Sequence, residues 1–211
     1  MKIDIWSDFV CPFCYIGKQH IEEAVKDKKN IKFEYHSFEL DPSAPEKVEE
    51  SMPDYFAKTK GFTPEQAETM VAQITEMANQ AGLAFHYETI QHSNTLKAHR
   101  LSQYAKEQGK GIHFMELASE GYFSNGEWLN DNAFLLTIAD QLNLDQEQAK
   151  KVLESKDAYL SDVQRDIAKA QEIGVEGVPF FVIDGKYGLS GAQPVETFKQ
   201  VLNEIEEKEQ S

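Results

Sequence analysis

The first forty residues show two different hydrophobic periods. Residues 2–6 alternate polar and apolar side chains, as a strand with one buried face does. Apolar positions then recur every three or four residues from Ile16 to Val25, which is the period of an amphipathic helix, and the lysines that follow suit the negative end of its dipole. Residues 31–38 alternate again. The pattern therefore predicts a strand, a helix and a second strand.

Two prolines between positions 41 and 45 interrupt this pattern, and a long helical region follows. Thr63 with Gln66 forms a capping box for a helix that stops near Gly82. Polar caps and glycines divide the rest of the region into four more predicted helices. The first of these is capped at Asn94 and ends near Gly109, and the second covers about 112–120 and stops near Gly121. The third begins at a cap at Asn130 or Asp131, and the fourth begins at Asp145 with Gln148.

The end of the chain predicts a helix, a hairpin of two strands and a final helix. The helix covers about 157–173 and ends at Gly174. Two short apolar runs at 180–183 and 187–190 flank Asp184-Gly185, a pair that favours a tight turn. The final helix carries one apolar face.

Together the two ends of the chain predict an α/β protein with a thioredoxin-like fold and an inserted all-helical domain. The expected boundaries are 1–43 and 156–211 for a discontinuous thioredoxin-like domain and 44–155 for the insert. The order β–α–β followed by α–β–β–α is what this interpretation depends on.

Charge and hydropathy exclude several classes of function. Lys and Arg number 21 against 36 Asp and Glu, a formal net charge of −15, so we expect neither nucleic-acid binding nor attraction to anionic membranes. No apolar run approaches the roughly 18 residues of a transmembrane helix. Asp4 and Asp8 stand where a signal peptide would have its apolar segment, which predicts a cytoplasmic protein.

The two cysteines of the chain are three positions apart, as Cys11-Pro12-Phe13-Cys14. A structural disulfide would close a loop of about four residues and restrict the unfolded chain by roughly 2 kcal/mol, against ~4.7 kcal/mol for a loop of ~100 residues. A catalytic role explains this spacing better than a structural disulfide does. Cys11 is placed at the start of the first helix, where free N–H groups favour a thiolate, and Pro12 suits the first helical position. We therefore predict Cys11 as nucleophile, Cys14 as resolving thiol and Pro12 as a residue that tunes them.

Two other interpretations of this pair remain. A zinc site needs four ligands, and the nearest histidine in sequence, His20, is six residues past Cys14, so we expect no metal. The other alternative is that both cysteines are buried and inert.

A second motif that indicates a functional site is Gly177-Val178-Pro179 before a Phe-rich strand, because proline is disfavoured inside a sheet. The sequence leaves open whether Pro179 is cis.

The chain resembles DsbA-like thiol–disulfide oxidoreductases of the FrnE type. Residues 7–18 resemble their active-site segment, 174–181 with 188–194 resemble their C-terminal hallmark, and 94–101 resemble their middle helix. The resemblance implies dithiol–disulfide exchange with protein or small-molecule disulfides. It implies no bound cofactor beyond a redox-active Cys11–Cys14 disulfide, with a low-molecular-weight thiol as electron partner and a monomer or homodimer as the assembly.

The resemblance also implies that Pro179 is cis and faces the cysteines. The backbone of Val178 would then pair with an extended substrate segment beside Cys11, and Phe13 would contact the same substrate. Periplasmic DsbA carries Pro-His between its cysteines. Because Phe13 removes that cationic stabiliser, we expect a milder oxidant here.

Two competing functions and two ambiguous residues remain. Glutathione-dependent 2-hydroxychromene-2-carboxylate isomerases and kappa-class transferases share this architecture, but they typically carry Ser at the position that matches Cys11. A chaperone-like binding module would need neither cysteine. We interpret His99 as a structural residue on a half-apolar helix face, and Asp8 as a turn former.

Overall fold

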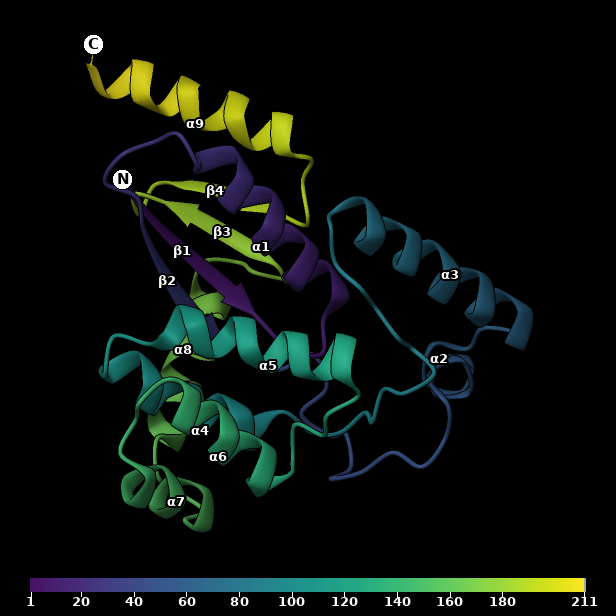
Figure 1. Cartoon of the computed structure of the whole chain (residues 1–211). Helices are drawn as coiled ribbons and strands as arrows, with labels where there is room; N and C mark the ends of the chain where they lie inside the picture. Colours follow the sequence, from purple (N-terminus) through teal and green to yellow (C-terminus); the bar gives the residue numbers. More distant parts are fainter. Residues whose placement is uncertain (211) are drawn as a thin grey trace.

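A four-stranded mixed sheet organises both ends of the chain (Figure 1). The computed structural model describes residues 1–210. Strand β1 (Lys2–Ser7) pairs in parallel with β2 (Lys32–Ser37) and antiparallel with β3 (Phe180–Ile183). Strand β4 (Tyr187–Ser190) pairs antiparallel with β3, so the strand order is β2-β1-β3-β4. The predicted strands and the hairpin at the end of the chain are confirmed.

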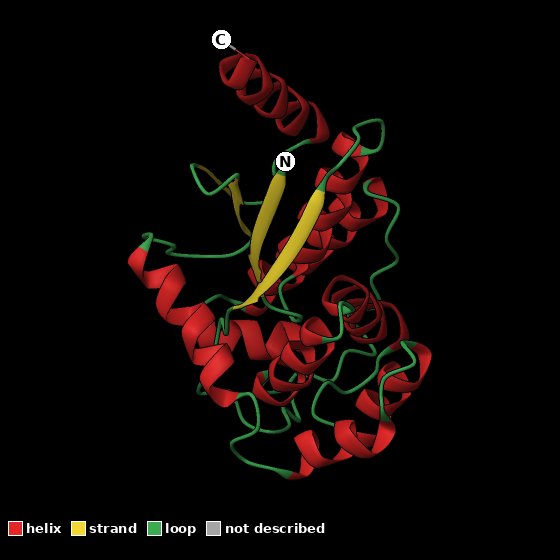
Figure 2. Ribbon diagram, turned by 90° about the vertical axis from the view of Figure 1, so that its left-hand side faces the viewer, coloured by secondary structure: helices red, strands yellow, loops and turns green. Residues whose placement is uncertain are grey.

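Alternation along β1 sends its side chains to two different layers. Ile3 and Ile5 are fully buried with residues of α1 (Pro12–Val25) and α9 (Val195–Gln210). Trp6 points to the other face, where it packs with Ala170 of α8 (Leu160–Glu172) and donates a hydrogen bond to a backbone carbonyl of that helix at 2.9 Å. Figure 2 shows the sheet with helices on both sides. The period of two in the sequence thus becomes a three-layer arrangement.

Six helices lie between β2 and α8, one more than predicted. They are α2 (Met52–Lys60), α3 (Pro64–Gln80), α4 (Leu96–Glu107), α5 (Gly111–Asn125), α6 (Asn132–Gln141) and α7 (Gln146–Glu154). The additional one is α2, whose N-cap Ser51 accepts a hydrogen bond from the Asp54 N–H. The predicted caps Thr63 with Gln66, Asp131, and Asp145 are confirmed by their side-chain hydrogen bonds.

Two details of the predicted helices are wrong. Helix α5 does not stop at Gly121; it continues to Asn125 and ends at Gly126, which has a positive φ of 67°. Gly121 serves packing, because a Cβ there would lie 2.2 Å from the ring of Phe134. The N-cap of α4 is the residue after Asn94, although the Asn94 side chain still accepts a hydrogen bond from the Leu96 N–H at 2.9 Å.

A single hydrophobic core joins the sheet to the inserted helices. The same cluster of buried side chains contains Ile5 of β1, Phe114 of α5 and Leu135 of α6. Helix α5 packs against β2, and α4 packs against α8. The boundaries of two separate domains therefore stay a prediction, while the core itself is shared. Within residues 1–210, no helix combines the length and the apolar composition needed to cross a membrane.

Candidate active site

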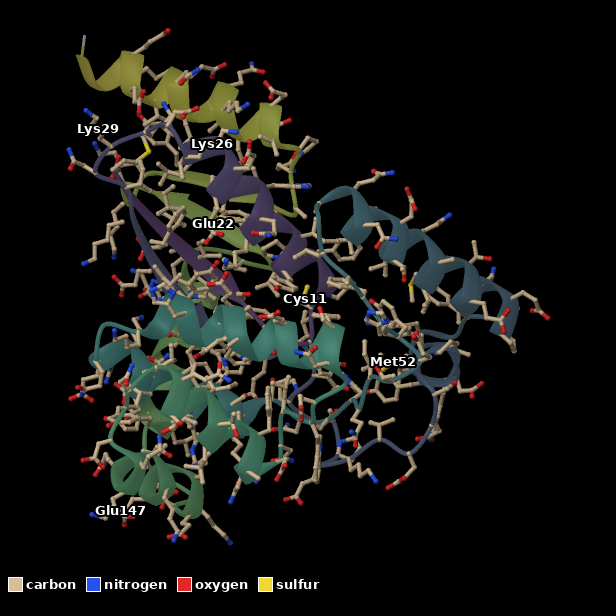
Figure 3. All side chains as sticks on the ribbon, in the orientation of Figure 1. Cys11, Glu22, Lys26, Lys29, Met52 and Glu147 are labelled. Atoms are coloured by element: carbon tan, nitrogen blue, oxygen red, sulfur yellow. The ribbon has the colours of Figure 1, made fainter. Side chains whose placement is uncertain are left out.

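Cys11 begins α1 at the end of the helix that faces the inserted helices (Figure 3). Cys11 is the N-cap and Pro12 occupies the first turn, as predicted. The Cys11 N–H donates to the Asp8 carbonyl at 3.2 Å, and the Cys14 N–H donates to the Cys11 carbonyl at 3.1 Å. These bonds place the two cysteines one helical turn apart at the start of the helix. Both cysteines are free thiols in this structure.

Both cysteines of the pair are buried. Cys14 is 2% exposed, as expected of a shielded resolving thiol, but Cys11 is also buried, at 3%. Phe13, between them, is 39% exposed and marks the open side of the site. Whether Phe13 contacts a substrate stays a prediction, and so does a tuning role for Pro12.

The environment of Cys14 keeps it protonated. Burial raises the pKa of Cys14 well above its ordinary value, and the hydrogen bond and negative charge of Cys11 raise it further. The Ser7 hydroxyl and the Asp8 backbone act in the opposite direction and lower it. The balance raises the pKa of Cys14 overall, so its surroundings favour the thiol over the thiolate.

The loop before β3 closes over the cysteines. The Val178–Pro179 peptide bond is cis. The Cys11 thiol donates to the Val178 carbonyl oxygen, with 3.6 Å between Sγ and O. Gly17 of α1 lets this loop approach the helix, because a Cβ there would lie 3.1 Å from Cγ of Pro179. Two segments far apart in sequence, the start of α1 and the loop before β3, thus lie against each other.

Asp8, which precedes Cys11, forms a buried pair with His99 of α4, a contact that the sequence did not predict. Asp8 is 1% exposed and His99 is 2% exposed, and 3.2 Å separates Oδ1 of Asp8 from Nε2 of His99. The other carboxylate oxygen of Asp8 accepts from the Leu40 N–H at 2.8 Å, and the His99 ring contacts Phe9. The only sequence signal was that both residues lie in segments that resemble the family.

A buried lysine is a further residue that sequence reasoning missed. Lys18, one helical turn after Cys14, is 1% exposed, and its Nζ lies 2.8 Å from Glu22 and 3.7 Å from Glu116.

The hydroxyl of Tyr35 is buried without a hydrogen-bond partner. Burial raises the pKa of Tyr35 well above its ordinary value, and the charges of Glu22 and Cys14 add to this. Tyr35 is therefore a neutral hydroxyl close to Cys14.

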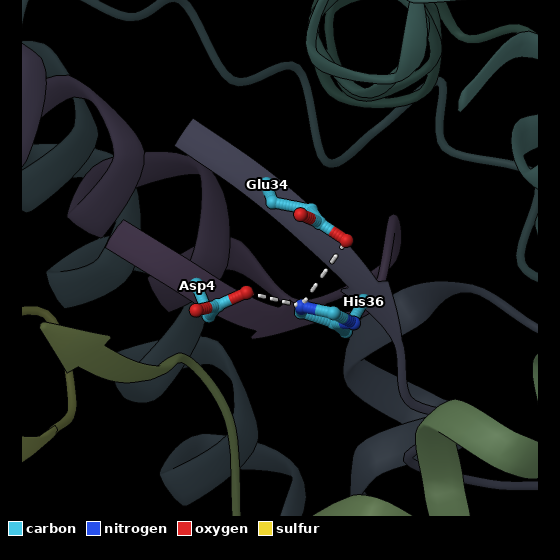
Figure 4. A group of neighbouring side chains, drawn as sticks. All are labelled: Asp4, Glu34 and His36. Atoms are coloured by element: carbon cyan, nitrogen blue, oxygen red, sulfur yellow. Dashed lines mark hydrogen bonds and ion pairs between the residues drawn. The ribbon is translucent and has the colours of Figure 1, made fainter. Parts of the chain in front are cut away.

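A second cluster of charges lies on the α8 side of the sheet. His36 has its Nε2 2.7 Å from Asp4 and 4.0 Å from Glu34 (Figure 4), and its Nδ1 2.9 Å from Asp166. Lys2 lies 2.7 Å from Asp4 and 2.8 Å from Glu34.

The spacing in this second cluster would suit a metal, since one donor atom each of Asp4, Glu34 and His36 falls within 4.8 Å of the others. Burial lowers the pKa of His36, but the bonds to Asp166 and Asp4 outweigh it and the pKa is raised overall. A protonated ring has no lone pair for a metal, and Lys2 already supplies a cation. We interpret the cluster as a structural ion network.

Replacing His36 by glutamine should change the pH dependence of stability. The raised pKa of His36 contributes stability that is complete below its ordinary value of 6.5 and is lost as the pH rises through the folded-state value. Burial raises the pKa of Asp4 and of Asp166, but the hydrogen bonds to His36 help to lower both pKa values overall. These carboxylates therefore contribute stability above their ordinary pKa of 3.8, and this stability is lost as the pH falls below it. Between these limits the variant should lose about 1–3 kcal/mol of unfolding free energy.

Urea unfolding measured across the pH range tests this expectation. The exposed His113 provides the matched control, because His113→Gln should leave the profile unchanged. If His36→Gln shifted the whole profile down in parallel, without a change of shape above its ordinary pKa, the imidazolium would not be what binds the two carboxylates.

Comparison with known proteins is consistent with this geometry. A family described as "DSBA-like thioredoxin domain" matches residues 2–203. The crystal structure of a probable DsbA oxidoreductase from Streptomyces coelicolor is 34% identical in sequence, with a TM-score of 0.91, over 97% of this chain and 89% of that chain. These matches confirm the predicted α/β, thioredoxin-like fold. They do not distinguish the FrnE type, which stays a prediction.

Two more distant structures share the fold alone. A 2-hydroxychromene-2-carboxylate isomerase is 14% identical, with a TM-score of 0.74, over 100% of both chains. The cytosolic disulfide reductase DsbM from Pseudomonas aeruginosa is also 14% identical, with a TM-score of 0.67, over 97% of this chain and 98% of that chain. A second structure of DsbM holds glutathione.

Proposed function

Because the chain belongs to the family of DSBA-like thioredoxin domains, we propose that it is a thiol–disulfide oxidoreductase with Cys11 as nucleophile and Cys14 as resolving thiol. One observation carries the proposal: a free Cys11 begins α1 and Cys14 follows one turn later. The helix start offers N–H groups to a thiolate at Cys11, whereas burial opposes ionisation of Cys14.

The exchange proceeds through a mixed disulfide. The Cys11 thiolate attacks one sulfur of a substrate disulfide, the S–S bond of the substrate breaks, and its other half leaves as a thiolate that takes up a proton. Cys14 then loses its proton and attacks the Cys11 sulfur, which releases the second half and forms the Cys11–Cys14 disulfide. The reverse sequence oxidises a substrate dithiol, so both directions use the same atoms.

Val178 is the residue we assign to substrate positioning. Its carbonyl accepts a hydrogen bond from the Cys11 thiol, and this bond is lost when Cys11 ionises. The free carbonyl can then accept from the backbone of an extended substrate segment, beside the exposed ring of Phe13. Pro179 holds this loop against α1 at Gly17.

A low-molecular-weight thiol is the electron partner we propose. DsbM, which shares the fold, has been crystallised with glutathione, and the site here needs no bound cofactor for exchange. A small thiol would reduce the Cys11–Cys14 disulfide by attack at Cys11, because Cys14 lies behind it. The cytoplasmic location that we infer from the sequence would supply such thiols.

Trapping of the mixed disulfide tests the proposal. In Cys14→Ala, glutathione disulfide should leave one glutathione on Cys11, because nothing displaces it, and mass spectrometry would detect this adduct. The wild type should instead end as the internal disulfide without adduct. Cys11→Ala is the matched control and should stay unmodified, since burial raises the pKa of the remaining Cys14 thiol and so opposes its ionisation. Modification of Cys14 in that control, or no adduct on Cys11, would contradict the assignment of roles.

A further inference from the structure

Cys14 must lose a proton at a place that bulk water does not reach. It is 2% exposed, and burial raises its pKa well above the ordinary value. Resolution of a mixed disulfide nevertheless requires the Cys14 thiolate. If the proposed function holds, a group inside the protein must therefore accept this proton, and it must connect to Cys14 through polar atoms.

A small cavity lined in part by polar side chains supplies such a connection. Its volume is about 10 Å³, close to the minimum of roughly 10–15 Å³ that one water molecule needs. Ser7, Tyr35 and His99 line it, together with other residues of β2, α4 and α5. The Ser7 hydroxyl donates to Sδ of Met115 at 4.0 Å and lies close enough to Cys14 to lower the pKa of that thiol. The Tyr35 hydroxyl is buried and unpartnered. Unpaired buried polar groups of this kind are what an internal water satisfies.

His99 is the proton acceptor that this cavity presents. Its Nε2 lies 3.2 Å from Oδ1 of Asp8. A neutral ring that donates from Nε2 to the carboxylate keeps a lone pair on Nδ1, so Asp8 selects the tautomer that can accept a proton and stabilises the imidazolium that results. The Leu40 N–H holds the second oxygen of Asp8 in place.

The other titratable groups around the cavity are less suited to this task. His36 also lines the cavity, but both of its nitrogens are held by carboxylates and its pKa is raised. Tyr35 keeps its proton, because burial raises its pKa. Glu39 lies near Asp8 and His99, and burial raises its pKa as well. The Nζ of Lys18 is already bound by Glu22 and Glu116, at 2.8 Å and 3.7 Å.

We propose that His99, oriented by Asp8, takes the proton of Cys14 through the Ser7 hydroxyl and a water in this cavity during resolution of the mixed disulfide. The Cys14 S–H bond breaks and His99 becomes an imidazolium. The Cys14 sulfur then bonds to the Cys11 sulfur, and the bond from Cys11 to the substrate sulfur breaks. The substrate thiolate leaves with that electron pair and takes a proton from solvent. His99 keeps its proton until reduction of the Cys11–Cys14 disulfide releases the Cys14 thiolate, which takes the proton back.

Stopped-flow reaction with dithiobisnitrobenzoate separates the two steps. Attack by Cys11 releases a first coloured thiolate, and resolution by Cys14 releases a second. In His99→Gln the ratio of the second rate to the first should fall roughly 10–100-fold at about pH 7. The deficit should shrink at higher pH, where hydroxide replaces the internal acceptor, whereas a merely structural defect would persist. His113→Gln, at an exposed histidine, should keep the wild-type ratio.

Asp8→Asn provides a second variant of nearly the same shape. The amide of the new side chain can donate to Nε2 of His99, which favours the tautomer with a proton on Nδ1, so Nδ1 can no longer accept one. The ratio of the second release rate to the first should therefore fall as in His99→Gln. A wild-type ratio in both variants would overturn the assignment of His99. A first release that survives in Cys11→Ser would instead overturn the proposed function, so the two failures are distinguishable.

Discussion

Replacing Cys11 by serine should lower the rate of disulfide exchange by at least about 10³-fold. A serine hydroxyl does not ionise near neutral pH, so the variant keeps the shape of the site but lacks the attacking sulfur. Turnover is measured as reduction of glutathione disulfide or insulin disulfides in the presence of a small dithiol. Circular dichroism and thermal unfolding should remain close to those of the wild type, because Cys11 forms no disulfide in this structure.

The same variant separates the competing functions. Members of the isomerase branch typically carry serine at this position, and one such isomerase shares the fold with a TM-score of 0.74. Glutathione-dependent isomerase activity that survives or increases in Cys11→Ser would favour that branch. A chaperone-like module would keep suppressing aggregation of unfolded clients even in Cys11→Ser/Cys14→Ser. Exchange activity that survives Cys11→Ser would contradict the role we give to Cys11.

Replacing Arg100 by methionine should cost about 3–5 kcal/mol of unfolding free energy, the largest loss of stability that we expect. Arg100 is 5% exposed and lies in α4. Its guanidinium donates to the backbone carbonyls of Val152, Ser155 and Lys156 at the end of α7. Val152 lies in the last turn of α7, where carbonyls have no partner within the helix, and Ser155 and Lys156 follow the helix directly. Methionine fills much of the volume but leaves three acceptors without a donor.

Thermal and urea unfolding measure this loss. A loss of about 3–5 kcal/mol corresponds to a fall in Tm of roughly 6–20 °C for a domain of this size. Arg165→Met is the matched control, because the Arg165 side chain is 72% exposed and pairs with Asp162 at the surface; it should cost less than about 1 kcal/mol. Equal effects of the two substitutions would show that the carbonyl cluster does not anchor α7.

Local signals in the sequence were enough for much of the fold. The β–α–β start, the hairpin around Asp184 and the Thr63–Gln66 capping box depend on side chains within a few residues of one another, so a short stretch of chain contains the whole interaction. Where a signal was ambiguous, packing decided. Gly121 looks like a helix stop, but its small size is required by the ring of Phe134, a contact between two helices.

The candidate site likewise combines features that local sequence patterns predict with contacts that only the folded chain creates. The spacing of Cys11 and Cys14, with Pro12 at the first helical position, is a local pattern, and it sufficed to place both sulfurs at the start of one helix. Asp8 and His99 were interpreted separately as a turn former and a structural residue. Their contact spans 91 positions of sequence, so no local pattern could reveal it.

By itself the sequence determined the four strands, most of the helices and a dithiol where a helix begins, because periodicity and capping act over a few residues. Only the tertiary structure decided that both sulfurs are buried, that Val178 and Pro179 close over Cys11, and that a histidine of the inserted helices reaches the acid that precedes Cys11. Burial and the partners of a buried charge depend on segments brought together from across the chain. Those contacts set the chemistry of the site.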